Sequence, residues 1–517
     1  MDASTLFDAS TMSATHRLVK QTLANDRGNQ PLLPSQPGED ALAEATAMLQ
    51  ERYTGRPLSV SKVQGTELNA NDDSRILQPW TPSNIVEEIS RQESDKACGS
   101  DGVHIQMLKA LLETNLPTLL ADLFNRCLRT RQVPSAWHTT EIYLLVKDKH
   151  QPRTPKNVRP ITIVAILRKV FECLLLQRIE HAPWAALHPA QAGFRKGYSA
   201  VAHAAYLHGL LRTRVLEGVV FLDFSAAFNR VDHTVLYHIL CQRGCPRNVL
   251  QLLVALLFKS ATSRVLANGD ASAPFARTCG VPQGSPLSPL LWNIFVDGLL
   301  YRLNAKADGR TRALFFADDG VLLVYANDDA QALLDVVVQW CSEVGIQLNV
   351  RKCGSVFREP LARPVRIGEQ PIPEVRQYTY LGFPVTIDGI DFAKHLQLRL
   401  EAALARATFF EPMASTWGPA HRVRVYYQYL APMFEYGAPL AWAWKQTLPS
   451  RSTQWATATS EPWKALVAWI GGSKTASRVT RNLLGLPTLE NRFESLHTSF
   501  QWHLERANPT SPLRNAI

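Results

Sequence analysis

The sequence predicts an α+β protein with two or three subdomains. Its 517 residues exceed what a single core usually supports. Stretches with apolar residues at helical spacing alternate with short runs rich in Val, Ile, Phe and Tyr, which favour strands. Hydrophobic residues make up 46% of the chain and charged residues 19%, a balance typical of folded proteins. This composition excludes disordered, collagen-like and low-complexity chains.

The net charge of +10 permits a polyanionic partner without requiring one. No basic segment followed by an apolar run opens the chain, and no stretch of eighteen apolar residues occurs, so we expect no membrane span. The eight cysteines are scattered and fit the reduced thiols of an intracellular protein. Cys241 and Cys245, with His233 and His238 nearby, match no zinc spacing.

The first half of the chain is predicted to be largely helical after an irregular start. Residues 1–75 are polar and resemble an arm or linker, with one amphipathic helix over Glu39–Tyr53. Thr81 and Pro82 then form a helix start, because Thr caps well and Pro fits the first helical turn. Helical spacing recurs from Ile105 to Leu128.

Three apolar segments are predicted to form strands. Ile142–Leu145 and Val219–Phe224 are short runs bounded by polar residues or Gly, which indicates buried strands. Ala313–Tyr325 contains two β-prone arms around Asp-Asp-Gly, which predicts a hairpin with a tight turn at those three residues. The hairpin therefore carries carboxylates at its tip.

The C-terminal region after about residue 390 has a different character. Residues 401–517 contain 12 Lys and Arg against 7 Asp and Glu, and seven of the twelve Trp. A basic, aromatic-rich helical region fits a surface that follows a nucleic-acid backbone. The alternative, which we favour for most of the individual Trp, is a helical bundle with Trp in its core.

Three carboxylates stand where strands end. Asp223 ends the run that starts at Gly218, and Asp318 and Asp319 occupy the hairpin tip. Three such groups within about 5 Å would repel by roughly 3 kcal/mol per pair at an effective dielectric constant near 20, which a divalent cation would cancel. Oxygen ligands without His or Cys favour Mg²⁺ or Mn²⁺. The alternative for Asp318 and Asp319 is an ordinary turn.

The ordered motifs of the chain resemble those of reverse transcriptases, and most closely those of non-LTR (LINE-type) retrotransposons. The similarity spans about residues 80–385. Its three main motifs are Phe221-Leu-Asp-Phe-Ser-Ala-Ala-Phe228, Gly280-Val-Pro-Gln-Gly-Ser-Pro-Leu-Ser-Pro289 and Phe316-Ala-Asp-Asp319. Similar blocks surround these motifs in the same order, namely Lys96–Gly102, Val158–Ile161, Gln191–Arg195, Leu348–Lys352 and Tyr380–Gly382.

The resemblance implies a right-hand polymerase with helical and β fingers, an α+β palm that carries an antiparallel sheet, and a helical thumb. We place an N-terminal arm at 1–75, the fingers at 76–218, the palm with inserted elements at 219–385, and the thumb with a C-terminal extension at 386–517. The implied partners are an RNA template, a DNA primer and dNTPs, and the implied location is the nucleus. The sequence leaves the oligomeric state open.

The resemblance also assigns the metal site and its chemistry. Asp223 and Asp318 would hold two Mg²⁺ ions, for which Mn²⁺ could substitute, with Asp319 beside them and the Phe224 carbonyl as a further ligand. Such ions activate the primer 3′-hydroxyl and neutralise the triphosphate. Lys352 matches a candidate proton donor to pyrophosphate, and a plain surface lysine is the alternative.

Five further residues take nucleotide and template roles by the same resemblance. Lys147 and Arg159 would grip the triphosphate, since Arg binds phosphate in a bidentate way, unless both are solvated surface charges. The Phe228 ring would close the space that a ribose 2′-hydroxyl needs, which favours dNTPs; a core aromatic is the alternative. Gln283 would contact the nascent base pair and Gly284 would let the template backbone approach.

We also expect a long helix to begin near Ser288 and Pro289, with Ser288 as its cap. No endonuclease or zinc-knuckle signature is visible, which suggests a polymerase fragment or a shortened copy of an element. Two other functions remain open. The chain could be a degenerate element remnant that binds nucleic acid without catalysis, or an RNA-dependent RNA polymerase or terminal transferase.

Overall fold

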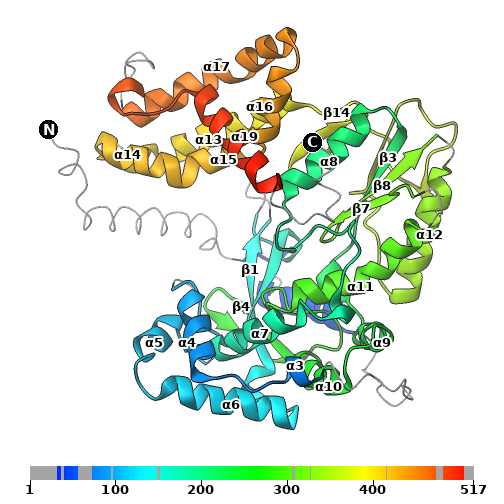
Figure 1. The fold of residues 1–517 in the computed structure, drawn as a ribbon, viewed down its shortest axis with the longest axis vertical. Helices are drawn as coiled ribbons and strands as arrows, with labels where there is room; N and C mark the ends of the chain where they lie inside the picture. Colours follow the sequence, from blue (N-terminus) through cyan, green and yellow to red (C-terminus); the bar gives the residue numbers. More distant parts are fainter. Residues whose placement is uncertain are drawn as a thin grey trace.

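The computed structural model describes most of the chain between residues 32 and 505. Its helices and strands form two larger sheets with helices around them, two small sheets, and a separate group of helices at the C-terminal end (Figure 1). The predicted α+β fold is therefore confirmed. The described residues are 32–35, 40–55, 73–94, 97–99, 101–147, 152–305, 309–326, 328–414, 416–472 and 481–505.

Strands distant in sequence form a four-stranded antiparallel sheet, which lies beside helices α8, α11 and α12 (Figure 1). The run from Val219 to Leu222 is fully buried within it, as the apolar sequence predicts for a strand covered on both faces. In spatial order the strands are β7 (Ala313–Phe316), β8 (Asp319–Tyr325), β3 (Leu216–Asp223) and β9 (Gly354–Phe357); the helices are α8 (Ala200–Arg212), α11 (Ser288–Leu303) and α12 (Ala330–Val344).

A second sheet of five strands packs against helix α2 (Ala41–Tyr53). The helix predicted at Glu39–Tyr53 is thus present, and the Asp40 side chain caps it by accepting hydrogen bonds from the amides of its first turn. Leu49 and Tyr53 join Ile142 of β1 in a small buried cluster. The strands are β2 (Val158–Ile163), β1 (Thr139–Val146), β4 (Thr262–Ala267), β5 (Asp270–Ala271) and β6 (Phe275–Ala276).

Seven further helices of the described residues share a core with the first sheet. Edge-to-face aromatic contacts join Trp80 to Phe124 and Phe171. The Thr81 cap is confirmed, because its hydroxyl accepts from Asn84 N in a capping box. These helices are α3 (Asp73–Ile76), α4 (Pro82–Arg91), α5 (Ile105–Ala110), α6 (Leu116–Thr130), α7 (Ile166–Ile179), α9 (His233–Gln242) and α10 (Arg247–Leu257).

The C-terminal helices follow two small sheets. No described helix is long and apolar enough to cross a membrane. The strands are β10 (Arg366–Ile367), β11 (Gln370–Pro371), β12 (Tyr378–Tyr380), β13 (Phe383–Thr386) and β14 (Gly389–Ile390). The helices are α13 (Phe392–Ala414), α14 (Pro419–Val425), a π-helical turn at Tyr426–Leu430, α15 (Ala431–Glu435), α16 (Ala438–Gln446), α17 (Pro449–Gly471) and α19 (Leu489–Glu505).

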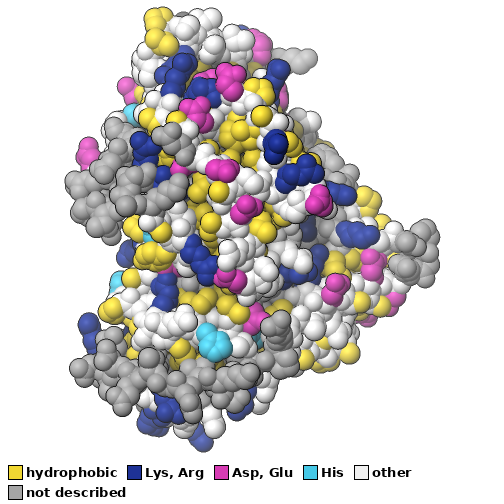
Figure 2. Space-filling view, turned by 90° about the vertical axis from the view of Figure 1, so that its right-hand side faces the viewer, with side chains coloured by type: hydrophobic (Ala, Val, Ile, Leu, Met, Phe, Trp, Pro, Cys, Tyr) yellow, Lys and Arg dark blue, Asp and Glu magenta, His cyan; other side chains and the backbone are white. Residues whose placement is uncertain are grey.

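Most of the C-terminal tryptophans pack in the helical core, which supports the alternative we favoured over a stacking surface. Trp455 is buried, and the Lys445 ammonium lies 5.0 Å from its ring centroid. Arg422 is also buried and donates to the Ala414 carbonyl, so part of the local positive charge is structural. Trp502 is 51% exposed. Figure 2 shows one face on which Lys and Arg are interspersed with acidic and apolar side chains.

Candidate active site

Asp223 and Asp319 lie directly opposite each other in the antiparallel pair β3 and β8. Asp223 is the last residue of β3, and Asp319 is the first of β8. Asp318 precedes Asp319 in the turn that joins β7 to β8. Tertiary pairing therefore brings together the strand end and the hairpin tip that the sequence singled out.

The hairpin is confirmed, but its turn differs from the Asp-Asp-Gly prediction. Phe316 pairs with Asp319, so the turn consists of Ala317 and Asp318, while Asp319 and Gly320 belong to β8. Ala317 adopts a left-handed φ of 59°. The side chain of Gln191 holds this turn, since its Oε1 accepts from Ala317 N at 2.9 Å and its Nε2 donates to Ala317 O at 3.2 Å.

Gln191 is a site residue whose role the sequence did not indicate. Its side chain is fully buried, and Oε1 also accepts from Gly193 N at 2.9 Å. A Cβ on Gly193 would come within 2.1 Å of Ala317 N, so glycine is required for this close approach. The sequence indicated this region only through the Gln191–Arg195 block, and nothing in that block shows that Gln191 binds Ala317.

Burial raises the pKa of all three carboxyls above the ordinary value. For Asp319 burial and the charges of Asp318 and Asp223 raise it to about 6. The Asp223 charge also raises the pKa of Asp318. The three groups are therefore close enough to repel, as expected for a site that gains from a bound cation.

The backbone beside Asp223 is bound to the segment around Leu348. Phe224 forms an antiparallel bridge with Leu348. The hydrogen bonds on either side join Asn349 N to Asp223 O and Ser225 N to Gln347 O, both at 2.8 Å. These bonds do not use the Phe224 carbonyl, and its expected role as an oxygen ligand stays a prediction.

The donor set fits Mg²⁺ better than a metal that needs a full protein cage. Within the described residues, no group of three or more His, Cys, Asp or Glu is gathered closely enough to hold a metal by itself. Mg²⁺ usually takes one or two carboxylates and completes its shell with waters and substrate phosphates. Asp223 and Asp318 supply carboxylates of the kind such a site uses, and their role as ligands stays a prediction.

Lysines and arginines from separate elements surround the carboxylates. The Lys352 ammonium lies 3.8 Å from Asp223 Oδ2, and its side chain is 65% exposed. Lys147 directly follows β1 and Arg159 lies in the adjacent end of β2; both side chains reach the surface, and protein atoms around the Lys147 ammonium still remove part of its water. Burial is the main cause of a lowered pKa for Lys147, and the charges of Lys352 and Arg159 add to it. The three predicted cations therefore face one site.

Arg52 belongs to this group of cations, although the sequence pointed only to a helix in an arm. Its charge also lowers the pKa of Lys147. Arg52 stands in the last turn of α2, which is tied to the β6–α11 connection because Tyr53 O accepts from Thr278 N at 3.0 Å and from Cys279 N at 3.1 Å. The N-terminal helix thus contributes a charge beside the site.

The ring of Phe228 is half-buried and held between two aromatic side chains. It stacks on Trp292 with centroids 5.5 Å apart and meets the edge of Phe194 at 6.1 Å. Phe194 is 62% exposed. The position of Phe228 in a short 3-10 turn, Ala227–Arg230, directly after β3 keeps the ring near Asp223 along the chain.

The loop with Gln283 and Gly284 packs against β2. Thr162 N donates to Gln283 O at 2.8 Å, and a Cβ on Gly284 would lie 2.0 Å from Thr162 O. Gly284 also has a φ of 145°. The close contact with β2 therefore explains why residue 284 is a glycine. The predicted contact with the template backbone stays a prediction.

Ser288 does not cap α11, contrary to expectation. It is the first helical residue, Leu287 occupies the cap position, and the Ser288 hydroxyl has no hydrogen-bond partner among the described residues. Ser285 instead accepts from Leu287 N at 3.3 Å. Ser285 lies at the start of the helix because the loop turns there, with Ser285 N donating a hydrogen bond to Pro282 O.

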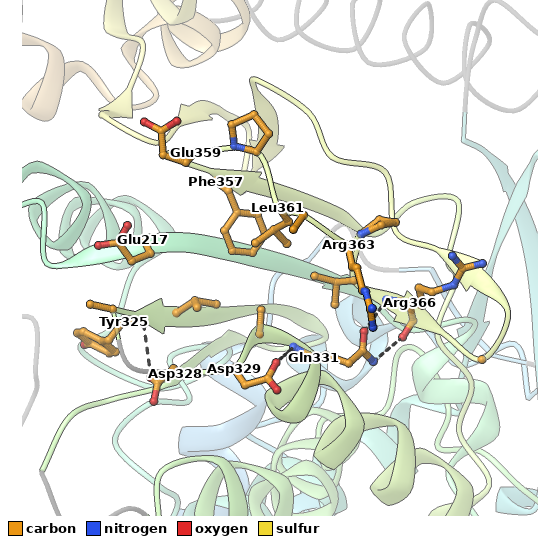
Figure 3. A pocket seen from close by; sticks show the side chains of 18 residues that line it. Glu217, Tyr325, Asp328, Asp329, Gln331, Phe357, Glu359, Leu361, Arg363 and Arg366 are labelled. Carbon is orange, nitrogen blue, oxygen red and sulfur yellow. Dashed lines mark hydrogen bonds between the residues drawn. The ribbon is translucent and has the colours of Figure 1, made fainter.

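A separate hollow of about 780 Å³ lies at the opposite end of the four-stranded sheet. Figure 3 shows Glu217, Tyr325 and Phe357 at its wall, from the ends of β3, β8 and β9 that lie away from Asp223 and Asp319. None of the predicted site residues lines it. This hollow is therefore distinct from the candidate active site.

The family model described as reverse transcriptase (RNA-dependent DNA polymerase) matches residues 146–385. Residues 146–385 are a reverse transcriptase domain. This reverse transcriptase domain contains all of the predicted catalytic and nucleotide-site residues, from Lys147 to Lys352. The resemblance seen in the motifs is thereby confirmed.

Three relatives extend the similarity beyond the reverse transcriptase domain. A putative 115 kDa protein of the R1DM retrotransposable element of Drosophila melanogaster is 28% identical over 77% of this chain and 39% of its own length. A probable RNA-directed DNA polymerase from the X-element of the same fly is 29% identical over 83% and 50%. The RNA-directed DNA polymerase of the jockey element of Drosophila funebris is 29% identical over 62% and 36%. The chain thus spans half or less of the length of these relatives.

Proposed function

We propose that the chain is the RNA-directed DNA polymerase of a non-LTR retrotransposon, which adds dNTPs to a primer 3′-hydroxyl on an RNA template. The pairing of Asp223 with Asp319, with Asp318 in the adjacent turn, is the observation that carries this proposal. It stands within a matched reverse transcriptase domain. The relatives named as RNA-directed DNA polymerases support the same activity.

The arrangement of the sheets supports a right-hand polymerase. We assign the four-stranded sheet to the palm, because it bears the three carboxylates, and the five-stranded sheet with its short helices to the fingers. The helices from α13 to α19 would form the thumb. In this assignment α2 belongs to the fingers, since it packs on their sheet.

The residues of the chain have distinct roles in the proposed reaction. Asp223, Asp318 and the Phe224 carbonyl would hold two Mg²⁺ ions, which lower the pKa of the primer hydroxyl and neutralise the triphosphate when bound. Lys147 and Arg159 orient the phosphates of the nucleotide by charge and hydrogen bonds. Lys352 would protonate the departing pyrophosphate, and the 3.8 Å between its ammonium and Asp223 Oδ2 supports this role.

Primer extension on an RNA template with Mg²⁺ and dNTPs tests the proposal. The wild-type chain should extend the primer, and Asp223→Asn and Asp318→Asn should lower the rate at least about a hundredfold because each removes a metal ligand. Asp270→Asn is the matched control, since Asp270 is an exposed residue of edge strand β5. Extension that persists in both site variants would refute the proposal. Salt-dependent template–primer binding without extension would instead indicate a binding remnant.

A further inference from the structure

A buried ion pair lies directly beneath the Gln283 loop. Arg168 and Glu172 of α7 are both fully buried, and Arg168 Nε donates to Glu172 Oε1 at 2.6 Å. The other oxygen of Glu172 accepts a hydrogen bond from the Ser285 hydroxyl. A second Arg168 nitrogen, Nη1, donates to Trp137 O at 2.6 Å. The carboxylate is thus anchored on one side and bound to the loop on the other.

Ser285 connects this ion pair to the whole loop. Its hydroxyl accepts from Leu287 N at 3.3 Å, and its amide donates to Pro282 O at 3.1 Å. On the opposite side, Gln283 O accepts from Thr162 N at 2.8 Å. The backbone of the loop is therefore fixed at two points, by Glu172 through Ser285 and by β2.

Glu172 is the negative charge shared by two buried arginines. Arg277 is also buried, and the charges of Glu172 and Arg168 both act on its pKa, which burial lowers to about 10. Arg277 Nε and Nη1 and Arg168 Nη2 have no hydrogen-bond partner among the described residues. Replacing Glu172 by a neutral residue would remove the negative charge that faces both guanidinium groups, which is costly in a buried position.

Stability alone gives a weak reason for such an arrangement. Well-packed apolar side chains in place of a buried ion pair are often equally stable. A buried charge with a directional hydrogen bond does fix the geometry of its partner, and here the partner is the loop that carries Gln283. The side chain of Gln283 itself is half-buried at the surface of that loop.

We propose that Glu172 is a positioning residue, which acts through the Ser285 hydroxyl to fix residues 282–287 so that Gln283 meets the nucleotide and its base pair. The inference rests on the proposed polymerase function. Glu172 does not contact the reacting groups in this account. Its effect is on nucleotide binding. A loop with several conformations places Gln283 in the binding-competent position for only a fraction of the time, which weakens the apparent affinity.

Ser285→Ala tests the inference, with Ser288→Ala as the matched control. The two serines lie three residues apart and are 3% and 1% exposed, but the Ser288 hydroxyl has no partner among the described residues. In primer extension, Ser285→Ala should raise the KM for dNTP about tenfold and change kcat less than about threefold, as expected for the loss of a hydrogen bond to a charged group. Ser288→Ala should leave both constants unchanged.

Two further measurements separate positioning from general stability. Ser285→Thr keeps the hydroxyl, so its KM for dNTP should be close to that of the wild type. Amide hydrogen exchange over residues 282–287 should be faster in Ser285→Ala than in Ser288→Ala or the wild type. An unchanged KM in a Ser285→Ala protein that extends primers would overturn the inference.

The exchange experiment also distinguishes failure of this inference from failure of the proposed function. If the wild-type chain extends no primer, the polymerase proposal fails, and with it the role of the loop in nucleotide binding. Faster exchange confined to Ser285→Ala would then still support Ser285 as the tether of the loop. Equal exchange in all three proteins would overturn the tether as well.

Discussion

Asp223 and Asp319 occupy facing positions at the end of one antiparallel strand pair, and the Lys352 ammonium lies 3.8 Å from Asp223. This relationship places like charges together with a cation that can offset them only in part. Burial raises the pKa of Asp223, whereas for Asp319 burial and then the charges of Asp318 and Asp223 raise it. The site is therefore an electrostatically unfavourable part of the fold when no metal is bound.

The first prediction concerns the stability of the metal-free protein. The Asp319 pKa of about 6 exceeds the ordinary value, so its contribution to stability is present below about pH 4 and is lost as pH rises through about 6. Asp319→Asn should raise the melting temperature in EDTA at pH 7.5 by about 2 °C, with less effect at pH 5. Differential scanning fluorimetry measures both values.

Mg²⁺ and a control variant complete this test. Mg²⁺ should raise the melting temperature of the wild type at pH 7.5, and more weakly at pH 5, where protons compete for the carboxylates. Asp270→Asn should respond to Mg²⁺ as the wild type does. A lower melting temperature of Asp319→Asn in EDTA would contradict the repulsion between the carboxylates.

The second prediction concerns sugar selection by Phe228. The ring is fixed by its stacking on Trp292. In the proposed role of Phe228, Phe228→Ala would open the space that a ribose 2′-hydroxyl needs. Selection for dNTPs over rNTPs should fall at least about tenfold, measured as the ratio of kcat/KM values in primer extension. Phe228→Tyr retains the ring and should keep the selection. Unchanged rNTP use by Phe228→Ala would assign the ring to packing.

The third prediction concerns the backbone of the loop. Gly284→Ala would force a Cβ to within 2.0 Å of Thr162 O at a φ of 145°, so β2 and the loop must separate. We expect the free energy of unfolding to fall by at least about 2 kcal/mol, and the rate of primer extension to fall as well. Urea denaturation measures the former.

Gly298→Ala is the matched control for this substitution. Gly298 lies within α11, and a Cβ there would meet nothing within 4 Å. Alanine should be neutral or stabilising by up to about 1 kcal/mol, since it favours the helix. A Gly284→Ala protein as stable as the wild type would show that the loop does not need this close approach.

The fourth prediction is a loss of stability in mild acid caused by buried histidines. Burial lowers the pKa of His395 to about 4, and its Nε2 lies 2.8 Å from Tyr436 O. Its contribution to stability is therefore present above about pH 6.5 and is lost as pH falls towards 4, by up to about 1.4 kcal/mol per pH unit. His395→Gln should show a shallower fall in unfolding free energy over this range.

Urea denaturation at several pH values measures this slope. His503→Gln serves as the control, because His503 is exposed near the end of α19. Identical slopes for His395→Gln and the wild type would mean that other groups, such as the buried His203 and His233, account for the acid sensitivity.

Much of the fold follows from local patterns in the sequence. The Thr81 cap, the strand that ends at Asp223 and the hairpin at 313–325 were all predictable, because each depends on neighbouring residues. The turn of the hairpin was placed wrongly. Asp-Gly favours a turn, but the buried Gln191 binds Ala317 and shifts the turn to Ala317 and Asp318.

The sequence by itself determined the chemistry of the site, since carboxylates at strand ends and an ordered set of motifs need no structure to be seen. Only the tertiary structure decided which groups meet. It placed Arg52 beside Lys147 and joined Ser285 to Glu172, across 113 positions of the chain. The physical reason is that hydrophobic periodicity encodes local structure over a few residues, whereas contacts between distant residues are settled by burial of the whole core.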